Sequence, residues 1–286
     1  MRSLTLPSLL FFCLLFFSGC QPDENQIAAR LIFKFKFDAT QVRLNNLGQP
    51  STVPAGNAGQ SLRFNKISAH YIELTPTATT ALGNGAVLFK NSETSAGGGT
   101  AIDFEKSTLV AEGEEFYSIP LNQVAAGSYP YLRVSLAYQN YDIDLLAQGA
   151  NLTGTLSSFI GYNTYVKNYT VKNQEVTVNA NKLQGYWAFE TSFGITEGQA
   201  PAGATTVPNP LSATSPIPAG SCVVTGLFAS PMIITGKETQ DIVVVVSLST
   251  NKSFEWIEKN VDGKFEPLAG ETVVDMGIRG LIPIVQ

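Results

Sequence analysis

Apolar and polar side chains alternate with a period of two along much of the chain, which is the pattern of half-buried β-strands. Between Leu31 and Asp38, four large apolar side chains fall on one face and two lysines fall on the other. The longest such segment, Tyr129 to Leu145, exceeds the usual strand length of about 3–10 residues, so we expect it to bend near Gln139–Asp142. No long stretch has the spacing of an amphipathic helix. The pattern predicts an all-β protein.

Three further segments carry specific expectations. The strand predicted at Leu62–Leu74 has polar residues in the middle of its apolar face, so a bulge or exposed corner is expected near Asn65–Ser68. The even-numbered residues of Leu132–Tyr138 are expected to share one face. The run Val243–Val246 has no polar side, which predicts a strand buried on both faces. Other strands are expected at residues 86–89, 100–105, 116–121, 156–161, 162–171, 175–180, 183–193, 222–228, 232–234, 254–258, 272–276 and 280–285.

The predicted strands are expected to form one antiparallel β-sandwich over residues 28–286, with long Gly- and Pro-rich surface loops. One such loop is expected at Asn45–Ser61 and another at Gly194–Ser221, which holds five prolines, four glycines and one charged residue. This second stretch is predicted to be a surface loop or, alternatively, a boundary between two domains. A valine-rich strand after it needs neighbours on both faces, which favours a single unit.

The first twenty residues form a separate segment. Arg2 precedes a mostly apolar run over residues 4–17, which is too short to cross a hydrocarbon core of about 30 Å as a helix. The run ends in Ser18-Gly19-Cys20, and the whole is typical of a cleaved secretory signal. It resembles the signals of bacterial lipoproteins. That resemblance implies that residues 1–19 are removed and that the Cys20 thiol carries the lipid. The alternative is an ordinary signal peptide cut nearby.

Residues 20–27 are predicted to be a lipidated tether. The acidic segment Gln21–Asn25 resembles the export tag that Bacteroidota place after the lipidated cysteine, which implies the outer face of the bacterial outer membrane. A solvated tether without a sorting role is the alternative. Two or three acyl chains hold a domain on a membrane durably, so the membrane is the first predicted partner.

Composition excludes several functions. Charged residues make up 14% of the chain, the formal net charge is −5, and lysine and arginine are not clustered. A nucleic-acid partner is therefore not expected. Once Cys13 leaves with the signal and Cys20 carries lipid, Cys222 is the single free thiol, so no internal disulfide can form. The single histidine, His70, cannot build a Cys/His metal site with it, and both residues are expected to be structural.

One loop has the oxygen spacing of a calcium site. Glu258, Asn260, Asp262 and Glu266 surround an Asp-Gly pair and resemble the first half of an EF-hand loop, which implies a calcium cofactor. The twelfth position, where the family has an acid, is Ala269. The alternative is a β-hairpin without metal, because Asp-Gly before Phe265 is itself a strong turn signal.

Tyrosines are numerous between residues 129 and 186. Tyr162, Tyr165 and Tyr169 are candidate ligand-binding residues, because aromatic rings with polar rims can stack on sugars. In a strand-rich protein the same residues can equally occupy ordinary half-buried positions. Asp142 and Asp144 lie two apart on one strand and are the candidates for a carboxylate pair in a hydrolase, although solvated acids at a strand end explain them as well.

The opening strand, the segment Phe64–Leu74 and Gly127-Ser128-Tyr129 resemble the MbnP-like β-sandwich lipoproteins of methanobactin-type copper cassettes. The resemblance implies a sandwich; a copper role is not implied, because cysteine and histidine are nearly absent. The sequence thus predicts a lipid-anchored, non-enzymatic surface protein whose loops capture a ligand, with a glycan as the candidate class. The alternatives are a structural or partner-binding envelope protein, such as an adhesin or a complex subunit, and a carboxylate-dependent hydrolase.

Lipidation generates the first testable prediction. Replacement Cys20→Ser removes the thiol that accepts the acyl group, so the protein is expected to lose metabolic palmitate label and to leave the membrane fraction. Cys222→Ser is the matched control and should keep both. A Cys20→Ser protein that stays membrane-bound with its label would contradict the anchor.

Overall fold

The computed structural model describes residues 28–45, 48–200 and 222–286. The predicted signal peptide, Cys20 and the tether up to residue 27 lie outside the described residues, as does most of the Pro/Gly-rich stretch. The described part contains β-strands and three short 3₁₀ helices, with no α-helix, which confirms the all-β class. Most strand pairs are antiparallel, and two are parallel: β1 with β15, and β6 with β10.

The strands are β1 (Arg30–Asp38), β2 (Asn57–Gln60), β3 (Arg63–Thr75), β4 (Ala86–Lys90), β5 (Glu93–Thr94), β6 (Ala101–Asp103), β7 (Glu115–Pro120), β8 (Gly127–Ala147), β9 (Ala150–Phe159), β10 (Asn163–Thr170), β11 (Glu175–Leu183), β12 (Tyr186–Thr191), β13 (Gly194–Gln199), β14 (Cys222–Ile234), β15 (Ile242–Ser249), β16 (Phe254–Ile257), β17 (Thr272–Asp275) and β18 (Leu281–Val285). The 3₁₀ helices are η1 (Phe104–Lys106), η2 (Leu121–Gln123) and η4 (Pro267–Ala269).

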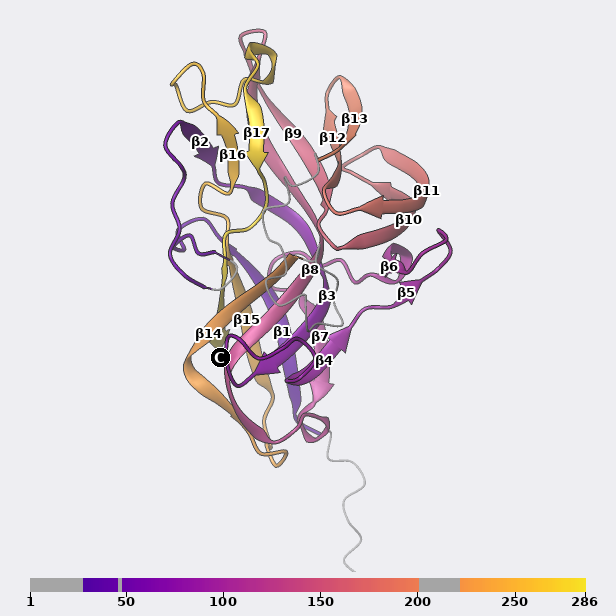
Figure 1. Cartoon of the computed structure of the whole chain (residues 1–286), viewed down its shortest axis with the longest axis vertical. Helices are drawn as coiled ribbons and strands as arrows, with labels where there is room; N and C mark the ends of the chain where they lie inside the picture. Colours follow the sequence, from indigo (N-terminus) through magenta and orange to yellow (C-terminus); the bar gives the residue numbers. More distant parts are fainter. Residues whose placement is uncertain (1–27, 46–47, 201–221) are drawn as a thin grey trace, which may run out of the picture.

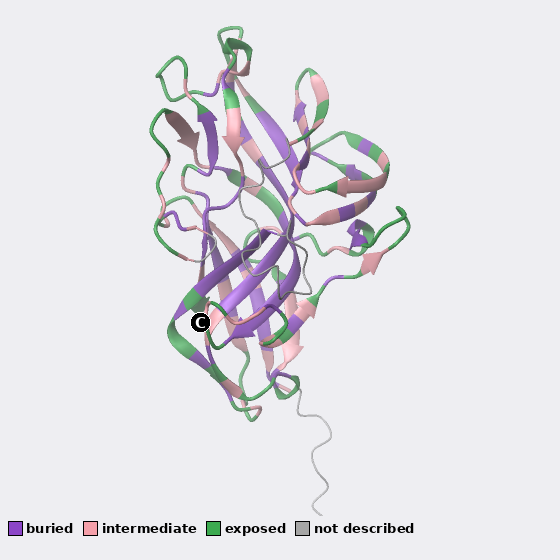
Figure 2. Ribbon diagram, viewed as in Figure 1, coloured by how far each residue is buried: buried purple, intermediate pink, exposed green. Residues whose placement is uncertain are grey.

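Strand β8 organises the molecule (Figure 1). It pairs with β3, β9 and β14 at different points along its 21 residues, within a sheet of order β13-β12-β9-β8-β3-β4. The sheet β18-β15-β1-β7 packs against the first half of β8 through the largest core cluster, to which Phe33, Leu132 and Val244 belong. Figure 2 shows this buried interior running through the centre of the lower half of the molecule.

Two facing bulges change the inward set of β8. Ala69 pairs with Leu136, but Ser68 pairs with Tyr138, so Ala137 is an extra residue on β8. His70 is an extra residue on β3. Inward positions are therefore even-numbered up to Leu136 and odd-numbered from residue 139 onward. The expectation that Tyr138 shares the face of Leu136 is wrong for this reason.

The register along β3 confirms an irregularity in the predicted place. Shifts occur between Phe64 and Lys66 and again between Ser68 and Ala69, at either end of the polar segment.

The valine run behaves differently from the expectation. Val244 and Val246 are fully buried, whereas Val243 and Val245 are only half-buried, because the second face of β15 is incompletely covered.

Two smaller sheets complete the fold. The sheet β11-β10-β6-β5 covers an aromatic cluster that includes Phe104 and Phe159, and the sheet β17-β16-β2 covers another around Trp256. Strand β2 lies within the segment predicted to be a loop at 45–61, since its four residues gain hydrogen bonds only from distant β16. Strand β13 likewise corrects the loop expectation at its first six residues, as the edge partner of β12.

Strands from both sides of residues 201–221 join the same sheets. β14 pairs with β8, and β15 pairs in parallel with β1.

In the part of the chain that the structure describes, no helix is long and apolar enough to cross a membrane.

Two buried charge clusters tie loops to the sheets. Glu73 and Arg133 are both fully buried, and Glu73 Oε1 accepts hydrogen bonds from the N–H groups of Gly83 and Gly85. Burial raises the pKa of Glu73 against the opposing effects of these donors and of Arg133. In the second cluster, Glu255 lies between the guanidinium groups of Arg43 and Arg279.

This second cluster generates a stability prediction. Glu255→Ala leaves two buried guanidinium groups without their shared carboxylate, and urea unfolding should show a loss of about 3–5 kcal/mol in the free energy of unfolding. The control is Asp144→Ala, which breaks an exposed pair with Arg63 and should cost about 0–1 kcal/mol. Equal losses in the two variants would show that Glu255 is not a central contact.

Candidate functional site

A cavity of about 490 Å³ lies against the odd-numbered face of β8. Strands β8, β9, β12 and β13 line one side, and β17 with residues 276–279 lines the other. The volume lies within the range of about 300–1,000 Å³ that is typical of small-molecule sites. Most lining side chains are apolar, and they include Ile143, Leu156 and Phe254. We call this cavity the β8 pocket.

The floor of the β8 pocket is formed by rows of cross-strand neighbours. Ser158 of β9 pairs with Gln139 on one side and with Trp187 on the other. Trp187 lies across β13, where a Cβ on Gly198 would come within 2.3 Å of the indole ring. Glycine at residue 198 is therefore what allows the ring to lie flat on the neighbouring strand. Phe189 extends the apolar floor by one row.

Gln139 is the unusual polar residue of this pocket. Its side chain is fully buried, yet neither Nε2 nor Oε1 has a hydrogen-bond partner among the described residues. A Cβ on Gly277 would lie 2.9 Å from Nε2 and 3.0 Å from Oε1, so the backbone of the opposite wall holds the amide closely. Buried amides are almost always paired, because leaving one unpaired is costly. Gln139 therefore brings one unpaired donor and one unpaired acceptor to the lining of the pocket.

The other charged and reactive groups of the pocket are already engaged. Burial disfavours the charge of Arg279, but Asp275 and Glu255 outweigh it and raise the pKa of the guanidinium. Burial raises the pKa of the Cys222 thiol to about 12, so the thiolate is not formed at neutral pH. Gln184 and Gln199 donate their amide N–H groups to the carbonyls of Ile160 and Gln184.

The predicted tyrosines do not form one platform. Tyr162 donates to Glu93 Oε1 at 3.0 Å, and buried Tyr169 donates to the Tyr186 hydroxyl at 3.2 Å. Tyr165 lies beside inward-facing Val166 and so points to the other face of β10. None of the three lines the β8 pocket.

Tyr169 instead lines a second cavity of about 350 Å³ on the opposite face of β8. Phe104, Tyr138, Asn140 and Lys66 also line it. The Asn140 amide N–H group already donates to the Ser157 hydroxyl and to the Val171 carbonyl, both at 2.8 Å. This second cavity thus offers aromatic surface without a comparable unpaired buried group.

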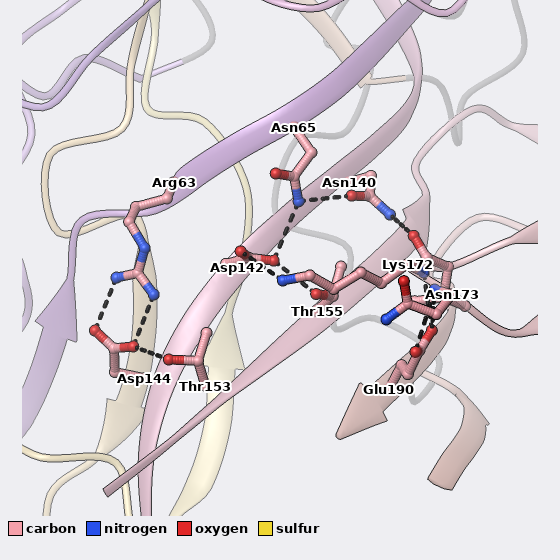
Figure 3. A network of polar contacts seen from close by, with 11 residues as sticks. Arg63, Asn65, Asn140, Asp142, Asp144, Thr153, Thr155, Lys172, Asn173 and Glu190 are labelled. Carbon is pink, nitrogen blue, oxygen red and sulfur yellow. Dashed lines mark hydrogen bonds and ion pairs between the residues drawn. The ribbon is translucent and has the colours of Figure 1, made fainter. Parts of the chain in front are cut away.

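Asp142 and Asp144 belong to a polar network on the even-numbered face of β8, the face that also lines the second cavity (Figure 3). Asp144 accepts two hydrogen bonds from Arg63, which holds the pKa of its carboxyl below the usual value. Burial acts against the charge of Asp142, but donors on Thr155, Asn65 and Lys172 outweigh it and lower the pKa. A general acid needs a raised pKa, so this pair is poorly suited to acid–base work.

His70 is a core histidine. It is 1% exposed and its Nε2 lies 3.1 Å from Glu93 Oε1. Burial lowers the pKa of the imidazole against the opposing effect of Glu93. No group of three or more His, Cys, Asp or Glu residues suited to a metal occurs within the described residues.

The loop predicted to bind calcium uses its oxygens internally. Glu258 Oε1 accepts the N–H groups of Asp262 and Gly263 at 3.0 Å, and Asn260 Nδ2 donates to Glu266. The Asp-Gly hairpin expectation is wrong in its extent, because β16 pairs with β17 across a loop of residues 258–271, and Phe265 packs into the core instead of beginning a strand.

Comparison of the chain with protein-family models, curated proteins and solved structures finds no significant match. Sequence reasoning missed Gln139 as a site residue and noted it only as part of a bend. No local signal marks it, because the bulge at Ala137 that turns it inward depends on pairing with β3.

Calcium remains a sequence-based prediction, and titration tests it. Because Glu258 and Asp262 already accept backbone N–H groups, we expect isothermal titration with calcium chloride to give no binding heat. The EF-hand-like alternative predicts heat that disappears in Glu258→Gln and persists in the control Glu105→Gln.

Proposed function

We propose that this protein is a lipid-anchored, non-enzymatic surface protein of the bacterial outer membrane that captures a small ligand in the β8 pocket. The observation that carries the proposal is the pocket itself, a largely apolar cavity whose lining includes Gln139 with its unpaired amide. Such a combination of apolar lining with a few oriented polar groups is characteristic of ligand sites. The Ser18-Gly19-Cys20 segment supports the anchor.

The arrangement of the fold supports an outward-facing site. The start of β1, which follows the predicted tether, lies at the lower end of Figure 1, whereas β12, β13 and β17 lie in the upper half. A protein anchored through Cys20 would therefore present the β8 pocket away from its membrane.

A glycan is the ligand class first suggested by the aromatic residues, and Trp187 offers a ring for stacking. Sugars, however, carry hydroxyl groups around their whole rim and need many polar partners. The β8 pocket has few free donors, since the amide nitrogens of Gln184 and Gln199 and the guanidinium of Arg279 already have partners. We therefore propose a ligand that is mainly apolar.

A partner-binding envelope protein is the second candidate. Phe193 is 81% exposed and Val261 is 86% exposed, and both lie on loops at the ends of strands that line or flank the β8 pocket. Exposed large apolar side chains at loop tips are typical of protein contact sites. The hydrolase alternative has less support, because Asp142 and Asp144 are neutralised by Lys172 and Arg63.

Blocking the pocket mouth tests ligand capture. The probe is N-phenyl-1-naphthylamine, an uncharged fluorophore whose fluorescence rises in apolar cavities. Thr196→Trp places an indole at the exposed rim formed by β13 and should lower probe affinity about tenfold, as expected when about 1.4 kcal/mol of contact is lost. Ser192→Trp, at the exposed tip of the β12–β13 hairpin, should leave affinity unchanged. Equal affinities for both variants and the native protein would contradict capture at this pocket.

A further inference from the structure

We propose that the β8 pocket selects a neutral, planar, ring-containing ligand whose polar edge carries a hydrogen-bond acceptor beside a donor, as in a carboxamide or a lactam. Gln139 is the residue that recognises this edge. The inference rests on the proposed function and specifies the ligand class of the same site.

The Gln139 amide is buried and unpaired. A primary amide presents a donor and an acceptor side by side, and here both lack partners within the described chain although the side chain is fully buried. A group that offers an acceptor and a donor in the same plane satisfies both at once. Carboxamides and lactams have this arrangement, whereas ketones, ethers and hydrocarbons satisfy one atom or neither.

The neighbouring strands and the Gly277 backbone fix the position of the Gln139 amide. The bulge at Ala137 turns Gln139 inward, and pairing with Ser158 of β9 sets its place in the sheet. The backbone at Gly277 closes the other side of the amide. A polar group held between two sheets recognises one orientation of a ligand, because little reorganisation accompanies binding.

The floor of the pocket beside Gln139 suits a planar ring. The row from Gln139 through Ser158 leads directly to the indole of Trp187, and Phe189 continues the floor. Planar rings stack well on such a surface, so the polar edge and the ring face are recognised by neighbouring strands.

The described lining of the β8 pocket disfavours a ligand with a charged edge. Arg279 is the only cationic side chain that lines the pocket, as far as the described residues show, and it is paired with Asp275 and Glu255. An ionised carboxylate would enter an apolar cavity without a free counter-charge, which is unfavourable. The neutral amide is therefore preferred over the carboxylate of the same shape.

Calorimetry with three matched probes tests the proposal. 2-Naphthamide carries both a donor and an acceptor, 2-acetonaphthone carries only the acceptor, and 2-naphthoate at pH 7.5 is charged. We expect 2-naphthamide to bind the native protein about tenfold or more tightly than either analogue, since a site with a buried polar pair rejects ligands that leave it unpaired.

Two glutamine variants separate recognition from structure. Gln139→Met removes an unpaired amide, so it should abolish the preference for 2-naphthamide and leave Tm unchanged or higher. Gln60→Met is the matched control, because that amide lies outside the pocket lining and is paired with both the carbonyl and the N–H group of Asp144 at 2.8 Å. It should lower Tm and keep the preference.

The outcomes are distinguishable. If the native protein binds the three probes equally, the β8 pocket captures ligands but Gln139 does not select them, and this inference is overturned while the proposed function stands. A lower Tm in Gln139→Met would show that the amide is internally paired, which also overturns it. If no probe binds and the Thr196→Trp change has no effect on the fluorescent probe, the proposed function itself fails.

Discussion

The pairing of β8 with three other strands is the constraint on which the structure depends. One strand must satisfy β3, β9 and β14 while its side chains fill different cores at its two ends. A regular strand would keep the same parity throughout. The extra residue Ala137 changes that parity on β8, and the extra residue His70 on β3 restores the register between the two strands. As a result, Leu136 faces the first core, and Gln139 lies on the same side of the sheet and lines the β8 pocket.

Local alternation predicted those elements that have one apolar side. Residues 31–38 became β1 with the expected buried face, and the long segment after residue 129 became β8. Elements whose stability comes from distant partners were not predictable, because β2 and β13 have weak patterns of their own and are ordered by β16 and β12. The same reason explains the site. Trp187 could be noted as an aromatic residue, but its place over Gly198 is a consequence of sheet order.

Two kinds of polar group in the interior contrast with each other. Glu73, Arg133 and Glu255 are buried charges with opposite charges or backbone donors around them, and they fasten loops onto the sheets. Such clusters are tolerated because each charge lies near an opposite charge. Gln139 differs, since its buried amide uses none of its capacity within the described chain. Places where local rules fail, such as a buried unpaired amide, are expected at functional or strained sites.

Gln139 and Asn140 are consecutive residues, and they line cavities on opposite faces of one sheet. Only the thickness of β8 separates the two spaces. A displacement of β8 at these two residues would therefore change the shape of both cavities, because each cavity takes part of its wall from this strand.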